Sequence, residues 1–260
     1  MINNSRIRQI FLSRHTLCDM ALKSLKAKYS NSILGISWAV VNPILIMLAV
    51  TFVFTAVYKI TTKDFSLFVL AGIFPWMFFS SALLEASASL INQQSVLRQF
   101  NLPREILPLA SVLSNFFNFL IGWLVIYPLF LFFNLKIISL IPLLFIILLL
   151  NFIFVCGLGL MLAILNVFFR DLGHLLGVLL MFWFWVTPVF YSLDMVPARF
   201  RWICSLNPMS PYTVYYRDVI FNNSIPGSEV FLGVFFWAAL SLILGFLTFT
   251  RLEGELLKRI

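Results

Sequence analysis

Charged side chains are scarce in this chain, and most of them lie between long apolar runs. Asp, Glu, Lys and Arg make up only 11% of the 260 residues, whereas 62% are hydrophobic. A water-soluble domain needs a charged surface, which this composition does not supply. We therefore expect lipid, rather than water, to surround most of the chain.

The usual signatures of catalysis and of metal or nucleotide binding are missing. Cys18, Cys156 and Cys204 are far apart and give no CxxC or Cys/His spacing, so we expect neither a disulfide framework nor a zinc site. The chain has no G-x-x-x-x-G-K-[ST] loop, no G-x-S-x-G elbow and no H-E-x-x-H motif. Asp194 and Asp218 are isolated acids. We therefore expect no enzyme, and no cofactor or metal bound by this chain.

Six apolar blocks are each close to the roughly 20 residues that a helix needs to cross a bilayer. They are continuous and do not alternate, which favours helices over the strands of a membrane barrel. The sequence predicts an all-α integral membrane protein that forms one domain over residues 1–260. The expected spans are 36–58, 66–90, 109–133, 140–165, 174–193 and 230–250.

Basic residues indicate how the chain is oriented. If the N-terminus is cytoplasmic, twelve of the 18 Lys and Arg lie on the cytoplasmic side, so we expect both termini there. Residues 5–30 alternate apolar and charged positions at helical spacing, which predicts a helix lying in the membrane interface. An anchoring helix that only orients the protein is the alternative. The basic excess matches an anionic lipid surface, and we expect no nucleic-acid partner.

Two segments between spans are too polar to cross lipid. We expect residues 93–105 to form a short helix that projects toward a cytosolic partner, with a solvated connector as the alternative. Residues 192–229 are rich in proline and aromatic residues, which favours short re-entrant or interfacial helices at 195–221. Thr187-Pro188 interrupts span five. Glu85, near the inner end of span two, is expected to be solvated or hydrogen-bonded.

Aromatic residues form 17% of the chain. Phe119, Trp123 and Tyr127 recur every four residues and so share one face of span three. Trp183 and Trp185 belong to an aromatic cluster in span five. Aromatic faces offer apolar surface without charge, which a conduit for sugars could use, and we expect these five side chains to line a pore. Lipid-facing or interfacial aromatics are the alternative.

Four segments, in order, carry recognisable motifs. They are KAKYSNSILGISW (26–38) with NP (42–43), LPREILPL (102–109), FRDLGH (169–174) with TPV (187–189), and NP (207–208) with YR (216–217). Together they resemble the membrane subunit of ABC exporters for polysaccharides. Ser30 departs from the pattern, since the family often has a basic residue there. The resemblance covers roughly residues 20–220.

The resemblance implies partners and a substrate class. Two copies of the chain would form a pore in the bacterial inner membrane, and two copies of a separate cytosolic ATPase would bind ATP and Mg. The substrate would be a glycan on a polyprenyl diphosphate lipid, with O-antigen expected first and teichoic acid or capsular polysaccharide as alternatives. A small-molecule exporter or a membrane glycosyltransferase is a more distant alternative.

Site residues follow from the resemblance and, for the diphosphate, from basic clustering alone. The ATPase-coupling residues are expected to be Val96, Arg98, Phe100, Pro103, Arg104 and Glu105. The lipid diphosphate is expected to contact Arg8, Arg14, Lys23, Lys26 and Lys28. The outer gate is expected to include Pro188, Tyr212, Tyr216 and Arg217.

Overall fold

A computed structural model describes residues 9, 12–30, 32–57, 65–99, 102–133 and 135–259. The regular secondary-structure elements of these residues are all helices, as expected. Five helices are long and apolar enough to cross a membrane: Gly35–Ala56, Phe65–Asn92, Ile106–Pro128, Ile138–Phe168 and Ser228–Leu256. Their bounds differ from the expected spans by at most six residues. The multi-pass membrane class of the protein is thereby supported.

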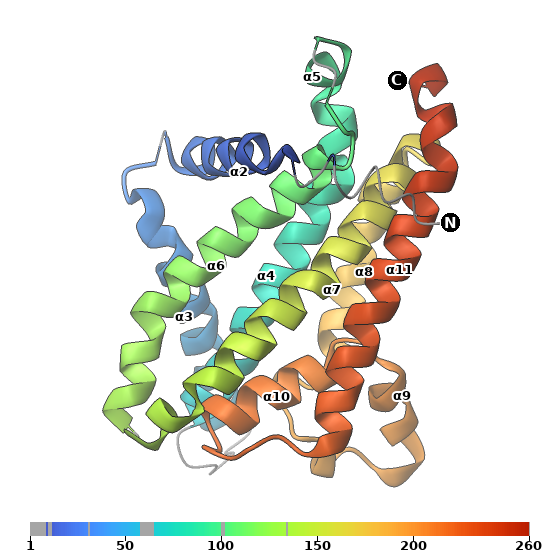
Figure 1. The fold of residues 1–260 in the computed structure, drawn as a ribbon. Helices are drawn as coiled ribbons and strands as arrows, with labels where there is room; N and C mark the ends of the chain where they lie inside the picture. The colour runs from blue at the N-terminus through green and yellow to red at the C-terminus, as the bar shows by residue number, and fades with distance from the viewer. Residues whose placement is uncertain are drawn as a thin grey trace.

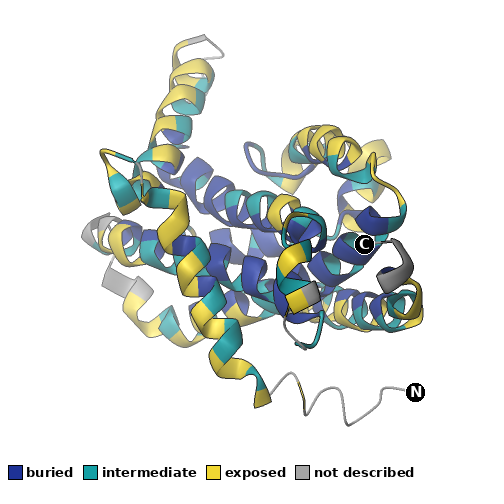
Figure 2. Ribbon diagram, turned by 90° about the horizontal axis from the view of Figure 1, so that it is seen from above, coloured by how far each residue is buried: buried dark blue, intermediate teal, exposed yellow. Residues whose placement is uncertain are grey.

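The central helix is α4 (Phe65–Asn92), which packs against α6 (Ile106–Phe133), α7 (Ile141–Phe168) and α3 (Trp38–Phe52). Most of its residues are apolar or small, as in a helix packed between other helices, and Glu85 is its one charged residue. Its buried residues include Gly72, Ala82 and Ala86. Figure 2 shows buried positions gathered in the middle of the bundle and exposed ones around its edge. The core therefore forms around α4.

The amphipathic helix predicted at 5–30 is α2 (Arg14–Tyr29) within the described residues. It lies across one end of the bundle, where it packs on α6 and buries Ala21 and Leu25 (Figure 1). The six-residue helix α5 (Gln94–Gln99) projects from the same end, and is shorter than the predicted 93–105. The C-terminal part of α11 (Ser228–Arg259) also reaches this end of the bundle. The basic residues of α2 lie at the same end.

Span five is represented by α8 (Leu172–Val186), which has 15 residues rather than the expected 174–193. It ends where it does because Thr187 precedes Pro188, and a residue before proline is driven to extended backbone. At 1.5 Å per residue the helix is about 22 Å long, less than a hydrocarbon core of about 30 Å. It carries the chain from the α2 end toward the α10 end (Figure 1). Its role as a sixth span stays a prediction.

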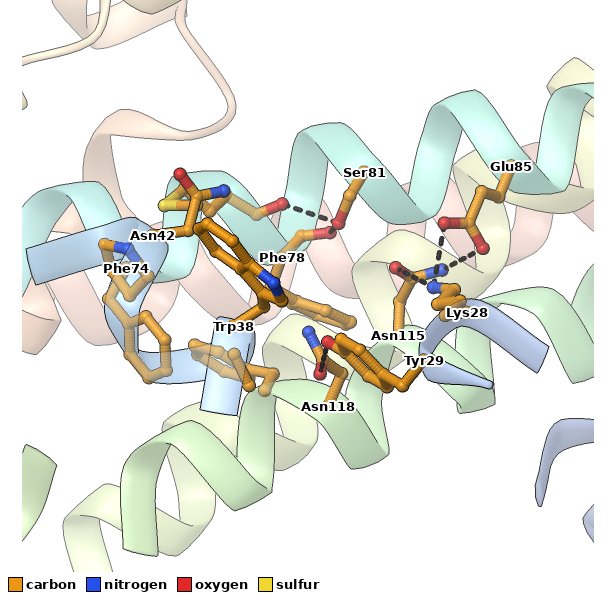
Figure 3. A pocket seen from close by; sticks show the side chains of 14 residues that line it. Lys28, Tyr29, Trp38, Asn42, Phe74, Phe78, Ser81, Glu85, Asn115 and Asn118 are labelled. Carbon is orange, nitrogen blue, oxygen red and sulfur yellow. Dashed lines mark hydrogen bonds and ion pairs between the residues drawn. The ribbon is translucent and has the colours of Figure 1, made fainter. Parts of the chain in front are cut away.

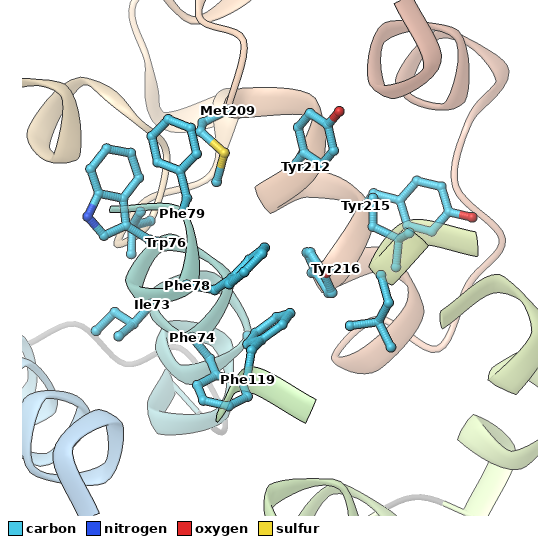
Figure 4. Packing of buried hydrophobic residues seen from close by; sticks show 14 of the residues in the cluster. Ile73, Phe74, Trp76, Phe78, Phe79, Phe119, Met209, Tyr212, Tyr215 and Tyr216 are labelled. Carbon is cyan, nitrogen blue, oxygen red and sulfur yellow. The ribbon is translucent and has the colours of Figure 1, made fainter. Parts of the chain in front are cut away.

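Short helices follow, as expected for 195–221: η4 (Leu193–Met195), η5 (Ala198–Phe200), α9 (Arg201–Leu206) and α10 (Ser210–Ile220). They lie at the end of the bundle opposite α2 (Figure 1). Tyr216 of α10 faces the aromatic side chains of α6, whereas Tyr212 stacks on Phe154 of α7 and Tyr215 lies toward Phe231 of α11 (Figure 4). Tyr212 and Tyr216 are fully buried there, so α10 is part of the core. Re-entry of these helices into the bilayer stays a prediction.

Candidate functional site

The first recognisable motif, residues 26–43, folds around a polar cavity. The cavity has a volume of about 230 Å³ and lies between the α2–α3 hairpin, α4 and α6 (Figure 3). The motif contributes six of the lining residues, among them Lys28, Trp38 and Asn42. Residues far apart in sequence, including Glu85 and Asn118, complete the wall. The best-marked segment of the sequence is therefore also the one that builds a site.

An ion pair joins the interface helix to the core at the wall of this cavity. Lys28 Nζ lies 2.8 Å from Glu85 Oε1 and donates a hydrogen bond of 2.8 Å to Asn115 Oδ1. Asn115 Nδ2 in turn donates to Glu85 Oε2 at 2.8 Å and to the Ser111 carbonyl. The three side chains form a closed ring of contacts between α2, α4 and α6. The expectation that Glu85 is hydrogen-bonded is confirmed.

A second polar link lies one residue further along α2. The Tyr29 hydroxyl donates to Asn118 Oδ1 at 2.5 Å. Burial raises the pKa of Tyr29, so the phenol remains a neutral donor at physiological pH. Trp38, at the start of α3, donates from Nε1 to Ser32 Oγ at 3.0 Å. These bonds fix the turn between α2 and α3 over the cavity.

We predict that the Lys28–Glu85 pair is coupled. Lys28→Glu places two carboxylates together, so it should destabilise the protein, and the swap Lys28→Glu with Glu85→Lys should recover part of the loss. Because the side chains are 24% and 41% exposed, we expect a coupling energy of only about 1 kcal/mol. Thermal unfolding of the single and double variants in detergent measures it. Losses that simply add would show that the pair is not coupled.

The remaining basic residues expected to contact a diphosphate lie on α2. Lys23 and Lys26 are exposed, and in the described part of the chain neither forms an ion pair. Arg14 is also exposed, and Arg8 lies outside the described residues. The charge of Lys28 is offset by Glu85, which distinguishes it from Lys23 and Lys26. Their contact with a diphosphate stays a prediction.

Two of the six expected coupling residues, Pro103 and Arg104, line a second cavity of about 450 Å³ between the residues just before α2, the α5–α6 linker and α11. Arg104 Nη1 donates to the Glu253 carbonyl at 3.0 Å and lies 3.6 Å from the Glu253 carboxylate. Glu105 is buried. The linker is thus tied to the C-terminal helix, a contact that the sequence did not reveal.

Of the other expected coupling residues, Val96 packs against the buried cluster that includes Leu90 and Leu107. Phe100 lies outside the described residues, as does the side chain of Arg98. The coupling role of this group stays a prediction. In the part of the chain that the structure describes, no three His, Cys, Asp or Glu residues come together as a metal site.

Two of the expected outer-gate residues, Pro188 and Arg217, lie at the break after α8, whereas the Tyr212 hydroxyl donates to the Val234 carbonyl and the Tyr216 hydroxyl accepts from Asn151. Arg217 is only 4% exposed, and its guanidinium donates to the carbonyls of Val189 at 2.5 Å and Tyr191 at 2.9 Å. The same group lies 3.7 Å from the centroid of the Phe68 ring. Pro188 is buried beside it. The guanidinium therefore supplies donors to two backbone oxygens of the non-helical segment that follows α8.

A second bond network joins the third and fourth motifs. Asn207 Oδ1 accepts from Trp183 Nε1 at 2.7 Å, and Asn207 Nδ2 donates to Thr187 Oγ1 at 2.9 Å. The Met209 amide also donates to Asn207 Oδ1, at 2.9 Å. The motifs at 187–189 and 207–208 are thus parts of one structural unit that fixes the end of α8 to α10. That these residues form an outer gate stays a prediction.

The five aromatic residues expected to line a pore are divided between the core and the surface. Phe119 and Trp123 are buried, and Trp123 stacks on Tyr216 with ring centroids 5.9 Å apart. Tyr127 is half-buried, and Trp183 packs on α4 aromatics. Trp185 is exposed. In this conformation Phe119 and Trp123 therefore contact the chain's own helices, and their pore role stays a prediction.

Asn115 and Asn118 are the site residues that sequence reasoning missed. They are three positions apart in an apolar span, so they lie on the same side of α6, and both bond to α2. A pair of amides within such a span was the signal that could have found them, because polar groups inside membranes need partners. Glu253 gave no comparable signal.

Comparisons with known proteins agree with the motifs. The ABC-2 type transporter family matches residues 17–221. Two proteins named O-antigen export system permease protein RfbA, from Klebsiella pneumoniae, are 30% and 29% identical over 236 and 240 residues, covering 89% of this chain and of each relative. RfbA of Myxococcus xanthus is 29% identical over 252 residues, covering 91% of this chain and 94% of the relative. The chain therefore belongs to the ABC-2 type transporter family, as a membrane permease subunit.

Proposed function

We propose that this chain is the pore-forming subunit of an ATP-driven exporter that moves a lipid-linked polysaccharide, O-antigen in the first instance, across the bacterial inner membrane. The observation that carries the proposal is the similarity, over about nine-tenths of both chains, to three permeases named for O-antigen export. The chain would have both termini in the cytoplasm. ATP and Mg would be bound by two copies of a separate ABC ATPase.

A homodimer would complete the pore. A cavity of about 340 Å³ lies between α3, α4 and α8, and its wall includes Trp76, Met77 and Phe184. Large apolar side chains of α8, such as Phe182 and Trp185, are exposed. We propose that a second copy faces this side, and that opening between the two copies forms the route for the glycan.

The proposal is tested by deleting the gene and following the surface polysaccharides. Loss of O-antigen from the surface, with lipid-linked glycan accumulating inside the cell, supports the proposal. If capsule or teichoic acid disappears instead, the substrate assignment is wrong and the export function stands. If every surface polymer is unchanged, the export function is wrong.

We predict that Arg104 positions the segment that contacts the ATPase. Arg104→Ala removes both its hydrogen bond and its ion pair with Glu253, whereas Glu253→Ala leaves the carbonyl acceptor in place. Export should fall about tenfold in Arg104→Ala, and less in Glu253→Ala, while ATP hydrolysis continues. Surface glycan and ATPase activity, measured on the same complex, test this.

Arg251→Ala is the matched control, because Arg251 lies on the same helix and is exposed. It should leave export unchanged. Normal export in Arg104→Ala would show that the linker is only a connector.

A further inference from the structure

We propose that the polar cavity between α2, α3, α4 and α6 binds one sugar ring of the lipid-linked glycan, next to the diphosphate. This proposal rests on the proposed function and names a place for part of its substrate. It starts from the observation that the residues lining the cavity combine an exposed indole with amide side chains and a carboxylate (Figure 3). Such a lining suits a small polyhydroxylated group in an otherwise apolar environment.

The charge of the cavity favours a neutral ligand. Lys28 and Glu85 both lie in the wall, and they pair with each other at 2.8 Å, so their charges offset. A diphosphate would bind weakly there, because repulsion by the Glu85 carboxylate would offset its attraction to Lys28. Lys26, two residues earlier and exposed, is better placed for the anion. The neutral sugar would therefore occupy the cavity, while the diphosphate to which it is attached would lie at the exposed face of α2.

The hydrogen-bonding groups of the cavity are available. Asn42 is exposed and makes no side-chain hydrogen bond with any described residue. Asn118 uses its oxygen for Tyr29, which leaves its amide nitrogen to donate. Glu85 is 41% exposed and can accept hydrogen bonds at its outer edge. Two amides and a carboxylate can together donate to and accept from the hydroxyl groups of one ring.

Trp38 supplies the apolar part of the site. It is 41% exposed although it belongs to the cavity wall, and in Figure 3 it lies between Asn42 and the Tyr29–Asn118 pair. Its Nε1 donates a hydrogen bond to Ser32 Oγ, which holds the ring in place through its edge. The face of the ring is left available to a ligand. An indole face packs well against the C–H side of a sugar, whose hydroxyls point outward around the ring.

The size and position of the cavity also fit. Its volume of about 230 Å³ is below the roughly 300–1,000 Å³ of drug-sized sites, so it suits one ring rather than an oligosaccharide. Met77 lines both this cavity and the apolar one between α3, α4 and α8. A sugar held here would lie one side chain away from the face that we propose lines the pore.

Binding of two defined lipids to the full chain in nanodiscs tests the site. The probes are a polyprenyl diphosphate alone and the same lipid carrying one N-acetylhexosamine. The wild type should bind the sugar-bearing lipid about tenfold more tightly. Asn42→Ala should reduce this preference about fivefold, the loss of one hydrogen bond, and Trp38→Ala should abolish it. Neither change should alter binding of the bare lipid.

Asn92→Ala is the matched control, because Asn92 is an exposed asparagine at the end of α4 and lies outside the cavity wall. It should keep the full preference. Equal binding of the two lipids by the wild type, or an unchanged preference in Asn42→Ala, overturns the sugar site. Failure of the sugar site would leave the proposed function intact, provided that deletion of the gene still removes the surface glycan. Loss of the function itself would appear separately, as unchanged surface glycan in the deletion strain.

Discussion

Replacing Gly157 with alanine is expected to lower the free energy of unfolding by about 3 kcal/mol. Gly157 lies where α7 and α11 pack closely, and a Cβ there would clash with the Ser241 carbonyl carbon, at 2.3 Å, far below van der Waals contact. A Cβ on Gly245, across the contact, would come even closer to the Gly157 carbonyl oxygen. Backbone atoms cannot rotate away, so the helices would have to separate. Glycine allows this approach, as small residues do between membrane helices.

The measurement is thermal unfolding of the purified protein in detergent, where the expected loss corresponds to a fall in Tm of about 6–12 °C. Gly254→Ala is the control, because a Cβ at Gly254, also on α11, would meet nothing within 4 Å. That change should be neutral or stabilising by up to about 1 kcal/mol, since alanine favours helix. Equal effects of the two substitutions would contradict the proposed close contact.

The second large effect is expected for Arg217→Ala, at about 4 kcal/mol. The change removes two charge-assisted hydrogen bonds, leaves the carbonyls of Val189 and Tyr191 without their donor, and removes the contact with Phe68. Because those carbonyls belong to the segment after α8, we also expect the break at Thr187-Pro188 to become mobile. Export should then be lost even in cells that still contain the protein.

Arg217→Lys separates charge from geometry. Lysine keeps the charge but cannot serve both carbonyls with a planar fork, so it should recover only part of the stability. Unfolding in detergent and surface glycan in cells are the two readouts. Wild-type stability in Arg217→Ala would show that the guanidinium does not hold this segment.

The sequence was sufficient for the helical membrane class and for the long spans, because about 20 apolar residues in a row have few alternatives in lipid. It also marked Thr187-Pro188, which is where α8 ends. The expected end of span five at residue 193 was too late. The apolar run continues past Pro188, but α8 ends before it; because α3, α4 and α6 each continue through an internal proline, the sequence did not show which proline would end a helix.

The contacts that build the site were not predictable in the same way. Lys28 and Asn115 are 87 residues apart, and Arg104 and Glu253 are 149 apart, so only the packed fold brings them together. The aromatic stripe shows a related limit. Four-residue spacing establishes that Phe119 and Trp123 share a face of α6, but it does not indicate whether that face meets a pore or the core.

The most direct test of the central claim uses proteoliposomes that contain the chain with or without its proposed ATPase partner. Lipid-linked glycan supplied outside inverted vesicles should enter the lumen only when the partner and hydrolysable ATP are both present. Transport by this chain alone, without a nucleotide-hydrolysing partner, would contradict the account.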